Sequence, residues 1–414
     1  MSRRALLFVE SNTSGTGLLF VRAARELGFA PVLATARPEA YAFLTGPDAP
    51  EVLVVERADE TTLEPLLRQR YGGWAGLAGI TSSSEHFVAT AAALAARFGL
   101  PGPDPAAVRA ARDKSWQRQA LSRAGLPVPA FRVAGSAPEA VWAAREIGGP
   151  VVVKPVVGTG SAGVRACATS VEAGRHAARV LDRAVAEGEP RRALVEARVE
   201  GPEFSVELFS GRAVGVTRKH LGAPPTFVEA GHDYPAAIPA AMARALETAA
   251  LRGTEVLGLG WGPLHWELRM RGDEAVVIEV NPRLAGGFIP ELVRHAQGID
   301  LVRDTLRLVT GEAPDPRPAH HRHASIRFLF APGEGRLGGV EGMDEARAAA
   351  GVVDAALYRA PGDALAVHGD FRDRIGHVIA CADGAAQAAE TAERARGAVR
   401  VVVDEPAGAL AGGA

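Results

Sequence analysis

Residues 264–283 read LHWELRMRGDEAVVIEVNPR. Apolar and polar side chains alternate up to Arg269, a Gly-Asp turn follows, and an apolar run returns from Ala275 to Val280. Two alternating runs on either side of a short glycine turn predict an antiparallel β-hairpin. On the return strand we expect one face to carry Val276, Ile278 and Val280, and the other face to carry Glu279 and Asn281.

The acidic residues of this hairpin are expected to converge. A tight turn brings Glu267 within one residue of lying opposite Glu279, so that two carboxylates and the amide of Asn281 share one surface. Like charges placed opposite each other are unfavourable unless a cation lies between them. Mg²⁺ binds carboxylate and phosphate oxygens together, so the hairpin predicts a magnesium site beside a bound nucleotide. A purely structural role would leave these charges buried and uncompensated, which is costly.

A second feature lies upstream, where residues 150–155 read PVVVKP and residues 158–164 read GTGSAGV. An apolar strand ends in Lys154, and a glycine-rich turn leads into another strand. Glycines let backbone N–H groups approach phosphate oxygens closely, and the lysine adds positive charge. No Gly-Lys-Ser/Thr follows, so this is not a Walker A loop. For this segment alone, a β-hairpin with a flexible tip is the alternative.

Two further features carry charged residues suited to a nucleotide. Residues 194–205 read LVEARVEGPEFS, in which Glu196 and Glu203 suit the amino group of adenine and the hydroxyls of ribose. The alternative is that these acidic residues lie in a solvated loop, where most charged side chains are found. Arg283 continues along the edge of the hairpin and could stabilise a developing oxyanion. Pairing of Arg283 with a metal-site carboxylate is the alternative from spacing alone.

Composition excludes several classes of protein. The chain of 414 residues is 47% hydrophobic and 23% charged, which is typical of a soluble globular protein. Its net charge of −2 gives no reason to expect nucleic acid or a membrane surface as a partner. Cys167 and Cys381 cannot form a disulfide framework or a cysteine zinc site, which fits a cytoplasmic location. We expect no signal peptide, because the first apolar run stops at Val9, and no membrane-spanning stretch of about 20 residues.

The N-terminus predicts a parallel sheet. A short apolar run at 5–9, a helical pattern ending at Gly28 and a second apolar run at 31–34 form a β-α-β unit. Further strands are expected at 51–55 and 77–81, with a helix over 88–98. The length of the chain predicts about three domains.

Taken together, these segments resemble the ATP-grasp superfamily, and the resemblance spans nearly the whole chain. It implies an N-terminal α/β domain (1–110), a linker helix with a small lid subdomain (111–195), a large subdomain holding the metal site (196–311), a C-terminal α+β lobe (312–404) and a disordered tail (405–414). It also implies binding of ATP with Mg²⁺, two ions being expected and Mn²⁺ being an alternative. By this resemblance the phosphates are contacted by Lys114, Lys154 and the glycine loop, namely Gly158, Thr159, Gly160, Ser161 and Gly163. The adenosine is contacted by Glu196, Ala197, Val199 and Glu203, and the metal by Glu267, Glu279 and Asn281.

Within the superfamily, the chain is similar to bacterial L-amino acid ligases, which make dipeptides. The segment RLAGG at 283–287 resembles their substrate and intermediate-binding segment, which implies roles for Arg283, Gly286 and Gly287. The segment FVEAGHDYP at 227–235 resembles the one that holds the amino group of the first substrate, with Glu229 and His232 as contacts. Asp233 stands where many relatives carry another residue, so the identity of the substrate stays open. For His232, a structural hydrogen bond in a loop is the alternative.

The resemblance predicts an ATP-dependent carboxylate–amine ligase that activates its acid as an acyl phosphate and acts on small-molecule amino acids, with Arg283, Lys154 and Gly287 at the reacting centre. It is compatible with a homodimer. One alternative keeps the fold and uses formate or bicarbonate. A nicotinamide oxidoreductase is a remote alternative, because GTGLLF at 15–20 lacks the third glycine of the dinucleotide fingerprint. A non-catalytic nucleotide-binding protein is another.

Overall fold

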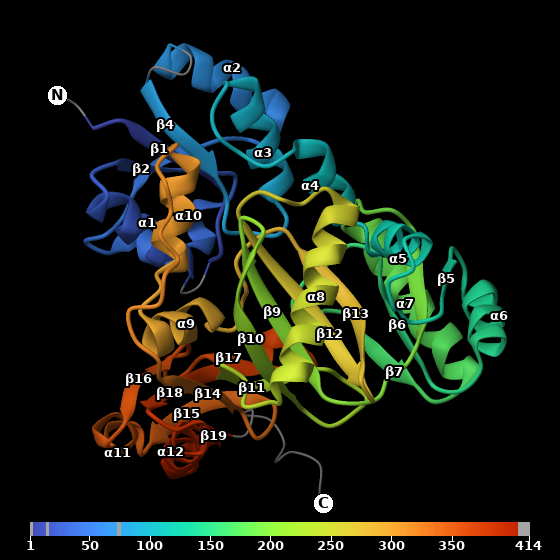
Figure 1. The fold of residues 1–414 in the computed structure, drawn as a ribbon. Helices are drawn as coiled ribbons and strands as arrows, with labels where there is room; N and C mark the ends of the chain where they lie inside the picture. The colour runs from blue at the N-terminus through green and yellow to red at the C-terminus, as the bar shows by residue number, and fades with distance from the viewer. Residues whose placement is uncertain (1–2, 14–15, 73–75, 405–414) are drawn as a thin grey trace, which may run out of the picture.

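A computed structural model describes residues 3–13, 16–72 and 76–404 (Figure 1). The predicted disordered tail at 405–414 lies outside the described residues. No helix in the described part of the chain is long and apolar enough to cross a membrane.

The N-terminal residues form the predicted parallel sheet, with strand order β3-β2-β1-β4. The β-α-β opening is confirmed, because β1 and β2 pair in parallel on either side of α1. The elements are β1 (Ala5–Val9), α1 (Thr16–Glu26), β2 (Ala30–Thr35), η1 (Pro38–Ala40), η2 (Ala42–Thr45), β3 (Glu51–Val54), α2 (Glu60–Tyr71), β4 (Leu77–Thr81), α3 (Val88–Arg97) and α4 (Pro105–Ala111).

Two helices follow each other much later in the sequence: α9 (Ile289–Gln297), which packs on strands β11 and β14, and α10 (Leu301–Val309), which completes the N-terminal region. Helix α10 packs against α1 and β4, and Figure 1 shows it lying over the N-terminal sheet. The approach is close: a Cβ on Gly79 would lie 2.5 Å from Cγ1 of Val309. The N-terminal sheet is therefore tied to the segment that directly follows the predicted metal site.

A four-stranded antiparallel sheet, with order β5-β8-β6-β7, forms the part of the molecule that we call the small subdomain (131–197). Its core is built largely from alanine and valine, so the two helices pack closely on one another and on the strands. The elements, with the helix that precedes them, are α5 (Lys114–Arg123), β5 (Phe131–Ala134), α6 (Ala137–Ile147), β6 (Val151–Pro155), β7 (Arg165–Cys167), α7 (Ser170–Ala186) and β8 (Ala193–Ala197).

The largest sheet among the described residues has eight strands, in the order β13-β12-β9-β10-β11-β14-β18-β16. Because β11 pairs with β14, the sheet continues across the predicted boundary at 312, and the expected C-terminal lobe shares it. The elements are β9 (Glu203–Phe209), β10 (Arg212–Leu221), β11 (Glu229–Tyr234), α8 (Ala240–Leu257), β12 (Pro263–Arg271), β13 (Glu274–Asn281), β14 (His323–Phe330), β16 (Val352–Leu357) and β18 (Arg374–Ala382).

The C-terminal residues add a smaller layer. Three strands pair in the order β17-β15-β19, and α12 packs on β14 and β18. The elements are β15 (Gly335–Glu341), α11 (Met343–Ala348), β17 (Ala364–Leu365), η4 (Phe371–Asp373), α12 (Ala385–Ala398) and β19 (Arg400–Asp404).

The predicted hairpin forms, but one detail of its pattern was wrong. A β-bulge pairs Glu267 with Glu279 and Leu268 with Val277, so Ile278 is an extra residue on β13. Val277 and not Ile278 therefore packs in the core, and Ile278 joins Glu279 on the surface that lines the pocket. The strict alternation that we expected does not survive a bulge, because an inserted residue reverses the facing of those that follow.

Candidate active site

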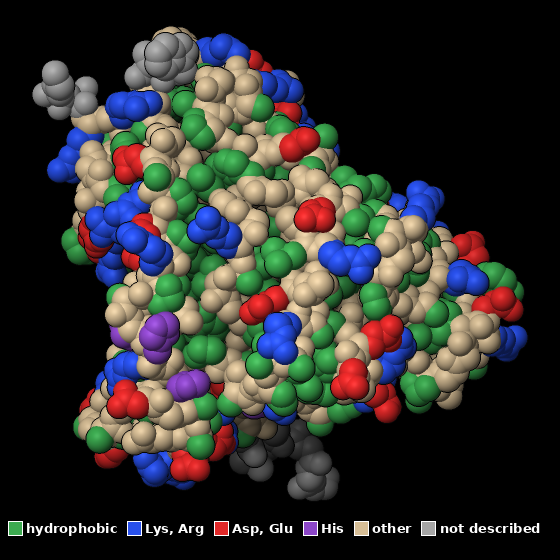
Figure 2. Space-filling view, in the orientation of Figure 1, with side chains coloured by type: hydrophobic (Ala, Val, Ile, Leu, Met, Phe, Trp, Pro, Cys, Tyr) green, Lys and Arg blue, Asp and Glu red, His purple; other side chains and the backbone are tan. Residues whose placement is uncertain are grey.

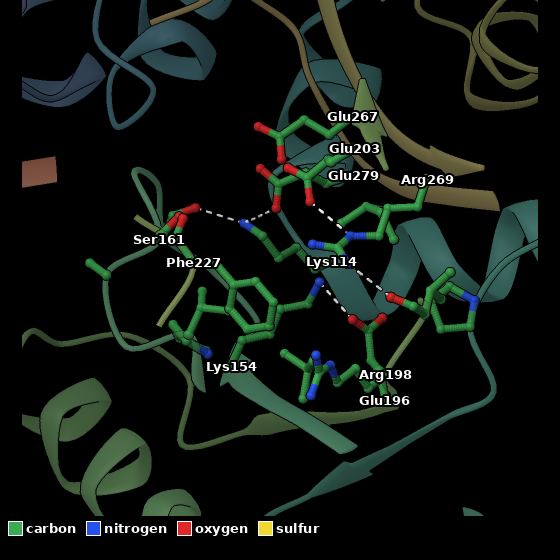
Figure 3. A pocket seen from close by; sticks show the side chains of 18 of the residues that line it. Lys114, Lys154, Ser161, Glu196, Arg198, Glu203, Phe227, Glu267, Arg269 and Glu279 are labelled. Carbon is green, nitrogen blue, oxygen red and sulfur yellow. Dashed lines mark hydrogen bonds and ion pairs between the residues drawn. The ribbon is translucent and has the colours of Figure 1, made fainter. Parts of the chain in front are cut away.

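A pocket lies between the small subdomain and the surface formed by β9, β11, β12 and β13 (Figure 3). Most of the predicted nucleotide and metal residues line it, together with the predicted substrate residue Glu229: Lys114, Lys154, Gly158, Thr159, Gly160, Ser161, Glu196, Ala197, Val199, Glu203, Glu267 and Glu279. The predicted residues outside this lining are Gly163, His232, Asn281, Arg283, Gly286 and Gly287.

Lys154 ends β6 inside the pocket and is held by Glu196. Its Nζ lies 2.6 Å from Oε2 of Glu196, while Arg118 of α5 donates to the other carboxylate oxygen. Burial lowers the pKa of Lys154, and the nearby Glu196 opposes that effect. Burial also disfavours charge on Glu196, but Arg118 and Lys154 bring the pKa of this carboxyl below its ordinary value. Because both oxygens of Glu196 are paired, its side chain positions Lys154 and Arg118.

The segment after Glu196 presents backbone and a second acid to the pocket. Glu203 accepts from Nε of Arg269 at 2.9 Å, and Nη1 of the same arginine donates to the carbonyl of Val199, also at 2.9 Å. Arg269 therefore joins the two ends of the segment that was expected to hold adenosine.

Lys114 opens helix α5, where Asp113 caps the helix by accepting from the amides of Ser115 and Trp116. Its Nζ donates to the carbonyl of Gly158 at 2.7 Å and lies 3.4 Å from Oε2 of Glu279. One lysine thus links the glycine loop (158–163) to the acidic hairpin.

The expected convergence on the hairpin is confirmed in its geometry. Glu267 and Glu279 lie directly opposite each other, and Nδ2 of Asn281 donates to Oε1 of Glu279 at 2.9 Å. Lysines balance the two acids, since Glu267 pairs with Lys219 and Glu279 with Lys114. No cluster of three or more His, Cys, Asp and Glu side chains among the described residues is arranged to hold a metal ion. Two carboxylates and an amide oxygen nevertheless form the oxygen-rich donor set that Mg²⁺ prefers.

Lys219 is the main residue that the sequence analysis missed. From β10, its Nζ lies 3.0 Å from Glu203, 2.8 Å from Glu229 and 3.0 Å from Glu267. Burial opposes charge on this lysine, but the three carboxylates hold its pKa well above the ordinary value. One buried cation therefore joins the expected ribose acid, substrate acid and metal ligand.

Composition held a signal for this residue. The chain has 46 lysine and arginine residues, and the lysines among them are Lys114, Lys154 and Lys219. All three are buried: Lys114 and Lys154 line the pocket, and Lys219 pairs with three acids that line it. Arginine supplies positive charge everywhere else, so lysine is kept where a compact point charge is required.

Three of the predicted substrate residues meet at one side of the pocket. Glu229 pairs with Lys219 and with Nη2 of Arg374, at 2.5 Å. His232 lies fully buried, with Nε2 3.5 Å from Oε2 of Glu229, and burial lowers the pKa of the imidazole. Gly287 has φ +59°, and a Cβ there would lie 2.5 Å from Nε2 of His232. Gly286, by contrast, faces open space.

Arg283 contacts a residue that the sequence analysis did not single out. Its Nε donates to Glu85 at 2.7 Å and its Nη2 donates to Oγ1 of Thr159 at 2.9 Å. Glu85 follows β4 in the run TSSSEH, at the carboxyl edge of the parallel sheet, where ligands of open α/β sheets are commonly bound. The pairing with a metal-site carboxylate, considered from spacing alone, is not what the structure shows.

The side chain of Asp233 contacts residues of the two neighbouring strands. It accepts from Nη1 of Arg327 at 2.8 Å and lies 2.6 Å from Nε2 of His220. Burial opposes its charge, but His220 and Arg327 hold the pKa of this carboxyl well below its ordinary value. Asp233 therefore braces β10, β11 and β14.

We expect Asp233→Asn to lower the free energy of unfolding by roughly 1.5–3 kcal/mol, as for other lost hydrogen bonds to a charged group. The stabilisation by Asp233 is present above the unfolded pKa of about 3.9 and is lost as pH falls through the lower folded value. Urea unfolding at pH 7 and at pH 3 checks this. The difference in the free energy of unfolding between variant and wild type should be smaller at pH 3 than at pH 7. A changed choice of amino acid substrate without a stability change would contradict the structural role.

Comparison with known proteins places these features in a family. Residues 147–291 match the model of the ATP-grasp domain, and residues 327–404 match that of the L-amino acid ligase C-terminal domain 2. The protein y4rH of Sinorhizobium fredii is 38% identical over 395 residues, which cover 95% of this chain and 82% of that protein. The D-alanine–D-alanine ligase of Marinobacter nauticus is 30% identical over 239 residues, covering 52% of this chain and 70% of the ligase.

The fold agrees with these matches. The crystal structure of an L-amino acid ligase from Bacillus licheniformis superposes with a TM-score of 0.85 at 20% identity, covering 98% of this chain and 100% of that one. The molecule is thus an ATP-grasp protein. Within that class the chain belongs to the carboxylate–amine ligase family and is related to the L-amino acid ligases.

Proposed function

We propose that this protein joins the carboxylate of one amino acid to the amine of a second, through an acyl phosphate, with ATP as the energy source. The products are a dipeptide, ADP and phosphate. The observation that carries the proposal is the contact of Lys219 with Glu229, Glu203 and Glu267, because it puts the expected amine-binding acid beside the expected nucleotide and metal acids.

Phosphoryl transfer requires positioning and charge neutralisation more than covalent chemistry by the protein. Lys114 and Lys154 contribute positive charge where the phosphates would lie, and the backbone amides of the glycine loop add hydrogen-bond donors. Glu267, Glu279 and Asn281 would hold Mg²⁺, which when bound neutralises the phosphate oxygens. Lys219 balances the charge of the acids that surround the site.

Amide formation follows from the acyl phosphate. The amine of the second amino acid attacks the acyl carbon, the C–O bond to phosphate breaks, and one proton leaves the amine. Arg283 is suited to stabilise the oxyanion of the tetrahedral intermediate, since Glu85 and Thr159 fix its guanidinium. Glu229 and His232 would orient the first amino acid against Gly287. A homodimer and a cytoplasmic location stay predictions.

The direct test is ADP release with ATP and Mg²⁺ across the twenty amino acids, singly and in pairs, with mass spectrometry of the products. Suppose that a pair of amino acids gives one ADP for each molecule of a product whose mass equals that of both amino acids less water. This result would support the proposal and identify the substrates. ADP release with bicarbonate or formate, and none with amino acids, would instead support the carboxylase-type alternative.

Gly287→Ala is expected to raise the KM for the first amino acid by about 10- to 100-fold, the range for one methylene in a tight pocket. The reason is the 2.5 Å approach of the new Cβ to His232, together with a left-handed backbone. Steady-state kinetics at saturating ATP measure this. Gly286→Ala is the matched control, because its Cβ would meet no atom within 4 Å, and equal effects of the two substitutions would refute the argument.

A further inference from the structure

A loop of the C-terminal residues reaches across to the glycine loop of the small subdomain. Phe371, at the start of η4, is 46% exposed, yet its ring lies against Gly160. A Cβ on Gly160 would come within 2.4 Å of Cδ1 of Phe371, so the bare backbone of the loop rests on the edge of the ring. The amide of Phe371 also points to the carbonyl of Gly160, at a distance of 3.5 Å. This contact joins segments more than 200 residues apart in the sequence.

The loop that carries Phe371 is braced from within. Asp370 is 2% exposed and accepts from the amide, Nε and Nη2 of Arg372, at 3.0, 2.9 and 2.6 Å. Asp373 accepts from the amides of His368 and Gly369, both at 2.7 Å. These bonds fix the turn without using any residue of the pocket, so the position of the aromatic ring is set in advance.

The same loop ends at a residue that contacts the expected substrate site. Nη2 of Arg374 lies 2.5 Å from Oε2 of Glu229, and its guanidinium lies 3.9 Å from the centre of the Phe328 ring. Three positions along the chain therefore separate a contact with the glycine loop from a contact with Glu229. Lys114 and Arg283 also contact the glycine loop and have expected roles toward phosphate and oxyanion, while Oγ of Ser161 donates to the carbonyl of Phe227 at 3.2 Å.

We propose that residues 368–374, the latch loop, hold the glycine loop closed over the pocket and couple this closure to occupation of the site at Glu229. This rests on the proposed function, because closure matters most for a reactive intermediate. Water that reached the acyl phosphate would attack it, break its bond to phosphate and return free carboxylate, phosphate and a proton. ATP would then be consumed without an amide being formed, so the exclusion of water determines how much amide is made for each ATP consumed. Phe371 is a positioning residue, since it touches the loop and no reacting atom.

Phe371→Ala tests the latch in the full-length protein. The ratio of ADP to amide is expected to rise roughly threefold or more above wild type, while the KM for ATP changes less, because water entry competes with the amine. Phe371→Leu keeps an apolar side chain at the contact and is expected to restore most of the coupling. Val353→Ala, which removes an exposed apolar side chain from β16 of the same region, is the matched control and should leave the ratio unchanged.

Hydrogen–deuterium exchange of residues 156–168, with a non-hydrolysable ATP analogue, measures the closure of the glycine loop independently of the reaction. Phe371→Ala is expected to speed exchange in this segment, whereas wild type and Val353→Ala stay protected. Unchanged exchange would overturn the latch, and faster exchange with an unchanged ADP-to-amide ratio would overturn its coupling to the reaction. If wild type made no amide with any pair, the proposed function would fail, while the exchange experiment would still decide whether the loop is latched.

Discussion

Lys219→Met is expected to lower the free energy of unfolding by about 3–5 kcal/mol, the range for removing one partner from a buried ion pair. The lysine side chain is 2% exposed, and its loss leaves the carboxylates of Glu203, Glu229 and Glu267 facing an apolar group. Like charges that lose their shared counterion must either repel one another or take up protons. Urea unfolding at pH 7 measures the loss, and turnover is expected to disappear with it.

Two further variants test whether the loss of stability comes from this ion cluster or from the removal of any lysine of the site. Lys114→Met removes a lysine with a single carboxylate contact, at 3.4 Å, and should cost much less stability while also stopping turnover. Adding Glu229→Gln to Lys219→Met should recover part of the stability, because it reduces the repulsion among the three neighbouring carboxylates. An unfolding midpoint of Lys219→Met equal to wild type would show that the three acids are neutralised in some other way.

The parts of the fold that follow from local pattern could be predicted from the sequence. Alternation around a short turn located the β12–β13 hairpin, and apolar runs separated by a helical pattern located the β-α-β opening. The bulge at Ile278 could not be predicted, because one extra residue leaves the composition of the strand unchanged while altering which side chains face the core.

The missed site residues share a physical cause. Lys219, Glu85 and Arg374 contact predicted site residues, and they do so through the pairing of strands and the packing of layers that are distant in sequence. No motif marks them, since each lies on an element whose local pattern looks ordinary. Strand order is a non-local property, and the continuation of the sheet from β11 into β14 was not visible in the hairpin patterns either.

Glu279→Gln is expected to reduce kcat/KM for ADP release by about 10³-fold, since several kcal/mol of charge stabilisation depend on the donor set. The amide is nearly isosteric with the carboxylate, but it lacks the negative charge that attracts Mg²⁺. The fold should persist, because Lys114 keeps its bond to the carbonyl of Gly158. Steady-state ADP release over a range of Mg²⁺ concentrations measures the effect, and the Mg²⁺ requirement should shift upward.

A matched control lies on the same strand. Glu274 begins β13 and pairs at the surface with Arg271, so Glu274→Gln changes the same chemical group without touching the pocket and should leave kcat/KM unaltered. Comparing the two variants shows whether turnover depends on the position of the lost negative charge or only on the loss of one charge from the strand. Near-normal turnover of Glu279→Gln would show that this carboxylate is no metal ligand. The acidic hairpin would then serve to hold Lys114 and Lys219 in place, and the charge that balances the phosphates would come from the lysines and the glycine loop.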